Sequence, residues 1–72
     1  MRVEEIHVPE GYAARNLSDA VPLSREYVVL AVRMAKSWQF NPPADFTLQP
    51  GNALVAMATP EGRRMLERAL VA

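Results

Sequence analysis

The sequence predicts an α+β domain in which a mainly antiparallel sheet is covered by two helices. Two stretches, residues 27–34 and 53–58, alternate like strands and are apolar on both faces. A helix start at Thr59-Pro60 precedes an amphipathic C-terminal stretch. Prolines and glycines divide the rest into short segments. The expected order is therefore β-α-β-β-β-α.

The first segments read as a strand and a short helix. Residues 3–8 predict a strand with at least one solvated face, because polar side chains alternate with Ile6 and Val8. A proline–glycine turn ends this strand. Asn16 can cap a helix of one or two turns, which Pro22 brings to an end.

The middle of the chain predicts three further strands. The first, residues 27–34, has one face made of Val28, Leu30, Val32 and Met34, and another made of Tyr27, Val29, Ala31 and Arg33. Residues 37–40 are expected to pair back on it as a hairpin. A type II turn at Pro50-Gly51 then leads into the strand of residues 53–58.

The last segment predicts an amphipathic helix over residues 60–70. Thr59 suits the N-cap, and Glu61 suits the positive end of the helix dipole. The expected buried stripe is Met65, Leu66, Ala69 and Leu70, and the expected solvated face is Arg63, Arg64, Glu67 and Arg68.

Length and composition indicate a single domain that needs a partner. The 72 residues form one unit, 1–72, which we expect to belong to a larger protein. A chain this short buries only about 60% of its unfolded surface, and it has no cysteine for a disulfide. Eight basic and eight acidic residues cancel, which argues against nucleic acid as a partner. No apolar run approaches the ~20 residues of a membrane span, so we expect no direct membrane insertion.

An ordered set of features covers nearly the whole chain and resembles a known family. The features are the strand of residues 3–8 with Gly11 and Leu17 after it, the run Val28-Val29-Leu30-Ala31-Val32-Arg33 with Pro42-Pro43 after it, the stretch from Leu48 through Gly51-Asn52 to Val55, and the helix of residues 60–70. This order resembles the C-terminal RCK (TrkA-C) domain of bacterial potassium channels and cation transporters. Asn52 and Ala58 depart from the aspartate and glycine usual there, and the usual serine near Gly11 is missing.

The resemblance implies regulation. Domains of this family lie on the cytoplasmic side of a membrane channel or transporter, form dimers, and in some members sense a small ligand or ion that controls gating. The same resemblance allows a purely structural module that holds transporter subunits together and binds no ligand. A nucleic-acid-binding partner domain is a third class, which the neutral charge disfavours.

The strands that are apolar on both faces predict a dimer interface. Two helices, one of them very short, are too few to cover both faces of the sheet, so we expect a second copy to cover one of them. Val29, Ala31 and Trp38 are the candidate interface residues. The alternative is that both faces are covered within one chain.

Arg33 and Tyr27 are the candidate ligand-binding residues. If their shared face meets a pocket, the guanidinium can hold an anionic group with paired donors. The alternative is that Arg33 lies at the strand end, where it reaches solvent or pairs with a carboxylate.

Other chemistry has little support in the sequence. His7, Glu4, Glu5 and Glu10 have no metal-ligand spacing, so no metal site is expected. Trp38 and Phe40 are more typical of core or interface anchors than of a stacking platform for bases. No catalytic set and no dinucleotide or phosphate-binding loop is present, so we expect neither enzyme activity nor a cofactor.

Overall fold

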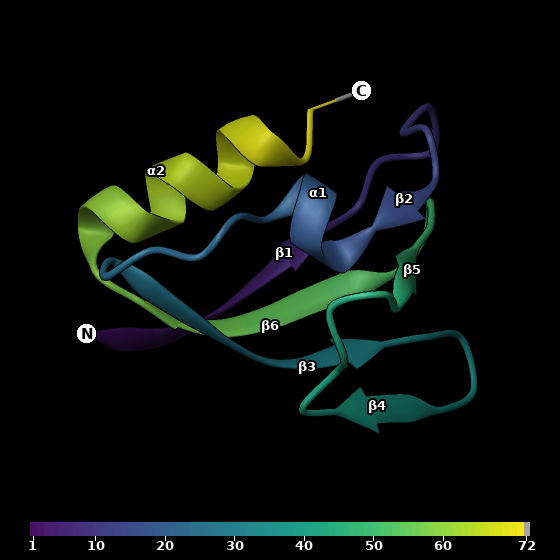
Figure 1. Cartoon of the computed structure of the whole chain (residues 1–72), viewed down its shortest axis with the longest axis horizontal. Helices are drawn as coiled ribbons and strands as arrows, with labels where there is room; N and C mark the ends of the chain where they lie inside the picture. The colour runs from purple at the N-terminus through teal and green to yellow at the C-terminus, as the bar shows by residue number, and fades with distance from the viewer. Residues whose placement is uncertain (72) are drawn as a thin grey trace.

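The computed structural model describes residues 1–71, which form a four-stranded antiparallel sheet with both helices on one side (Figure 1). The elements are β1 (Arg2–His7), β2 (Arg15–Asn16), α1 (Leu17–Ala20), β3 (Tyr27–Arg33), β4 (Trp38–Phe40), β5 (Thr47–Leu48), β6 (Ala53–Ala58) and α2 (Pro60–Ala69). The predicted α+β fold, with a mainly antiparallel sheet and two helices, is confirmed.

The four strands lie in the order β1-β6-β3-β4. The C-terminal strand β6 therefore lies between β1 and β3 (Figure 1). β3 and β4 form the predicted hairpin, closed by the Met34 N–H donating to the Ser37 carbonyl at 2.8 Å. The predicted turn before β6 is also present, because Gly51 has φ +86° and the Asn52 N–H donates to the Gln49 carbonyl.

A second, two-stranded sheet was not predicted. β2 and β5 pair antiparallel, with Arg15 opposite Leu48 and Asn16 opposite Thr47. Each strand has only two residues, which is too short for alternation to appear in the sequence. The pairing places Leu48 in the core, where it is fully buried, and it holds α1 next to the segment that precedes β5.

A bulge in β3 corrects the predicted face assignment. Val29 lies opposite Ala56 of β6, but Ala31 lies opposite Val55, so one extra residue is inserted at Leu30. The prediction that residues 27, 29, 31 and 33 share one face was therefore wrong. The insertion places Tyr27 and Val29 on the face toward the helices, and Ala31 and Arg33 on the opposite face.

The hydrophobic core lies between the sheet and the two helices. Its largest fully buried side chains are Val32, Leu48, Leu54 and Leu66. The predicted stripe of α2 is confirmed, because Leu66 and Leu70 are buried and the other two members are half-buried.

The start of α2 is fixed tightly to the start of β3. The Thr59 hydroxyl accepts the Gly62 N–H at 3.0 Å and donates to the Glu26 carboxylate at 2.7 Å, which confirms the predicted cap. The Thr59 N–H also donates to the Glu26 carbonyl at 2.9 Å. Gly62 lies directly against that carbonyl, so close that a Cβ built on it would stand 2.1 Å from the oxygen.

Candidate functional site

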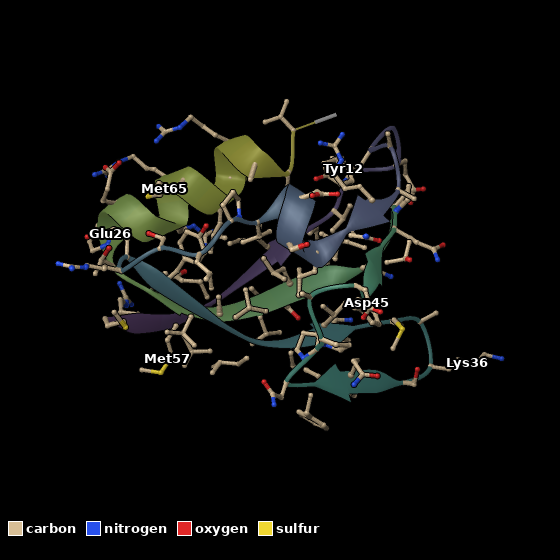
Figure 2. All side chains as sticks on the ribbon, in the orientation of Figure 1. Tyr12, Glu26, Lys36, Asp45, Met57 and Met65 are labelled. Atoms are coloured by element: carbon tan, nitrogen blue, oxygen red, sulfur yellow. The ribbon has the colours of Figure 1, made fainter. Side chains whose placement is uncertain are left out.

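The sheet has one face that is turned away from both helices, which we call the open face. Its first row of side chains crosses three strands, because Val3 of β1 and Val28 of β3 both lie opposite Met57 of β6. All three are exposed. Figure 2 shows Met57 pointing away from the helix layer.

Aromatic side chains extend the open face onto β4. Phe40 lies opposite Ala31, and Trp38 lies opposite Arg33. The two rings are stacked, with centroids 5.7 Å apart and planes 5° apart. They remain 48% (Trp38) and 69% (Phe40) exposed, so the stack lies on the surface and is not part of the core.

The open face is the main apolar surface of the domain. Its exposed large apolar side chains are Val3, Val28, Leu30, Trp38, Phe40 and Met57. No element of residues 1–71 covers them (Figure 1). Contiguous apolar surface of this kind marks an interaction site far more often than isolated exposed leucines do.

The predicted interface residues fall on two different surfaces. Ala31 and Trp38 lie on the open face, but Ala31 is buried, so only Trp38 presents its side chain there. Val29 lies on the opposite face because of the bulge, and it packs against the core. Sequence reasoning missed Val28 and Met57. The only available signal was the alternation of each strand, which does not show which strands are neighbours.

Arg33 makes an ion pair on the open face instead of facing Tyr27. Its Nε and its terminal nitrogen both lie 2.8 Å from a carboxylate oxygen of Glu5 on β1. β6 lies between β1 and β3, so the pair spans the central strand. Pairing of Arg33 with a carboxylate, the alternative interpretation, is confirmed. The structure does not bring the two candidate ligand residues together.

Tyr27 is a buried structural residue on the helix side of the sheet. Its hydroxyl donates to the Pro22 carbonyl, which ties the segment after α1 to β3. Burial raises the pKa of the Tyr27 hydroxyl above its ordinary value of about 10. The folded state therefore favours the neutral phenol.

This raised pKa predicts a loss of stability at high pH. The contribution of Tyr27 to the free energy of unfolding is fully present below about pH 10, where the phenol is neutral in the unfolded state too. It is lost as pH rises through the higher folded-state pKa. Tyr27→Phe is expected to reduce that alkaline loss and to cost about 1 kcal/mol at neutral pH. Urea unfolding from pH 7 to pH 11 measures both effects. An identical alkaline loss in Tyr27→Phe contradicts the prediction. Tyr12→Phe, which also loses one hydroxyl hydrogen bond to a carbonyl, is the control at neutral pH.

A groove of about 640 Å³ runs between α1, the segment after it, and β3. We call it the edge groove. Its main lining residues are Leu17, Val21, Pro22, Leu23, Tyr27 and Val29, with hydroxyls from Ser18 and Ser24. None of the described residues that line it carries a charge. Val28 also lines the edge groove, so this groove adjoins the open face.

Two of the acidic residues considered as metal ligands form ion pairs with arginines instead. Glu4 pairs with Arg63 of α2, and Glu5 pairs with Arg33. His7 is exposed at the end of β1. Within residues 1–71, no group of three or more His, Cys, Asp or Glu is placed to hold a metal ion.

The chain matches no protein-family model and no curated protein. None of the helices within residues 1–71 is both long and apolar enough to cross a lipid bilayer.

Proposed function

We propose that this chain is a regulatory domain of a potassium channel or potassium/cation transporter, which dimerises through its open face on the cytoplasmic side of the membrane. The transport role is supported by the ordered set of sequence features that resembles the TrkA-C domain. Dimerisation is supported by one structural observation, the apolar face of the sheet that no helix covers.

The dimensions of the open face set the expected strength of this contact. The six or seven residues of β1, β3 and β6 and the three residues of β4, in strands about 4.8 Å apart, give a flat area of roughly 350 Å². A standard interface buries about 800 Å² on each partner. We therefore expect isolated domains to associate weakly, with a dissociation constant in the micromolar range, and more strongly when they are joined to other subunits.

Sedimentation equilibrium of the isolated domain tests this proposal. A monomer–dimer equilibrium over roughly 1–500 μM is the expected result, because micromolar affinity corresponds to about 8 kcal/mol of association free energy. A folded domain that stays monomeric throughout this range contradicts dimerisation through the open face.

A second candidate function is assembly without a ligand. It is favoured by the state of the predicted ligand residues, because Arg33 is already paired with Glu5 and Tyr27 is buried on the other face. A thermal-shift screen of nucleotides and divalent cations separates the two functions. A ligand at 100 times its dissociation constant adds about 2.7 kcal/mol of stability, whereas a pure assembly domain shows no shift with any of them.

A further inference from the structure

The first half of β3 has an unpaired edge. Val8 exchanges backbone hydrogen bonds with Gly51 and Asn52. These bonds show which residues of β6 turn their backbone groups toward β1 and which turn them toward β3. Because this direction alternates along the strand, Met57 turns its N–H and C=O toward β3, where it lies opposite Val28. The backbone groups of the residues on either side of Val28, residues 27 and 29, must therefore point away from β6.

No strand among residues 1–71 receives these groups. β4 pairs with β3 only from Ala31 onward, and the Asn41 N–H donates to the Leu30 carbonyl where that pairing ends. Among residues 1–71, no hydrogen bond reaches the outward N–H or C=O of Tyr27 or Val29. Such a row of unsatisfied groups is a template for one more strand.

The edge groove lies beside this unpaired edge. A residue placed opposite Val29 would share its face, so its side chain would enter the groove next to Leu17 and Val21. The groove lining is apolar and contains no charged residue, so it favours an uncharged segment. Burying an unpaired charge there would cost binding free energy. Ser18 and Ser24 supply the only side-chain hydroxyls apart from Tyr27, which is bonded to Pro22.

A second copy of the chain does not fit this edge. In an antiparallel pairing centred on Val28, Ala31 of one copy would lie opposite residue 25 of the other. β4 flanks β3 on this same side from Ala31 onward, so each β4 would occupy the place of the other copy's residues 23–25. Only an isolated extended strand avoids this overlap.

We propose that the unpaired edge of β3 and the edge groove bind an extended, uncharged peptide segment of another protein by strand addition. The segment pairs with the backbone of Tyr27 and Val29, and its alternate apolar side chains fill the groove. This site is separate from the dimer contact of the open face, and its occupation does not require dimerisation.

A titration with acetyl-Thr-Val-Thr-Val-Thr-amide, followed by ¹⁵N NMR, tests the proposal. We expect saturable shifts centred on Tyr27 and Val29 and slower exchange of their amide protons. The same peptide N-methylated at both valines is expected to bind at least about tenfold more weakly, because it has lost the required donors. Equal binding of the two peptides, or no saturable shift from either, overturns the proposal.

Two variants locate the site. Val29→Pro removes an outward donor and leaves the ladder to β6 intact, as proline is tolerated at such edges. It should weaken peptide binding at least about tenfold. His7→Pro, which removes an outward N–H from the other edge of the sheet, is the matched control and should bind like the wild type. Wild-type binding by a folded Val29→Pro overturns the proposal. So does concentration-dependent protection of these amides without peptide, which would place a second copy there.

Discussion

Met57→Lys is expected to leave the domain folded and to weaken its self-association at least about tenfold, or 1.4 kcal/mol. Met57 lies in the middle of the first row of the open face, between Val3 and Val28. A lysine there places a charge in the centre of an apolar contact, and Glu5, a carboxylate on the same face, is already paired with Arg33. The exposed position lets the ammonium group reach water in the monomer, so stability should change by less than about 0.5 kcal/mol.

Leu23→Lys is the matched control for this experiment. Leu23 is a fully exposed apolar residue that lines the edge groove and does not lie on the open face. Sedimentation equilibrium of both variants should show normal association for Leu23→Lys and weakened association for Met57→Lys. The reverse pattern would place the dimer contact at the groove and contradict the assignment to the open face.

Gly62→Ala is expected to destabilise the domain by about 2–4 kcal/mol. In an ordinary helix this change gains about 1 kcal/mol, because glycine is the poorer helix former. Here the new Cβ would stand 2.1 Å from the Glu26 carbonyl oxygen, which is a backbone atom and cannot rotate away. The start of α2 must move outward, and that movement breaks the contacts of Thr59 with Glu26.

Thermal and urea unfolding measure this loss. For a domain of this size, each kcal/mol lowers Tm by about 4–8 °C, so a decrease of at least about 8 °C is expected. Arg68→Ala is the control, because it is an exposed position on the same helix and should change stability by less than about 0.5 kcal/mol. A Gly62→Ala variant as stable as the wild type would show that α2 shifts without losing its contacts with β3.

The local elements of this fold were predictable because local chemistry determines them. Thr59-Pro60 starts α2, and the apolar stripe ending at Leu70 follows from helix periodicity alone. β6 follows from a turn residue with positive φ, Gly51, and the alternation after it. In both cases every signal lies within about ten residues of the element that it specifies.

The candidate site was only partly predictable, because it depends on which strands are neighbours. The excess of apolar strand surface correctly indicated that one face would lack cover. The choice of Val29 failed because the bulge at Leu30 has no local signature such as a glycine. The Arg33–Glu5 pair requires β1 to lie two strands from β3, which alternation within a single strand does not reveal.

The bulge also determines which changes β3 can tolerate. Before the inserted residue Leu30, the odd-numbered residues of β3 face the helices, and after it the even-numbered residues do. Replacing that leucine with another residue alters one exposed side chain. Deleting it would join Val29 directly to Ala31 and remove the bulge, while every other residue of β3 kept its partner on β6 and its face of the sheet. The loss of one residue is therefore accommodated at Leu30, whereas a deletion within either paired half of β3 would move side chains between the core and the open face.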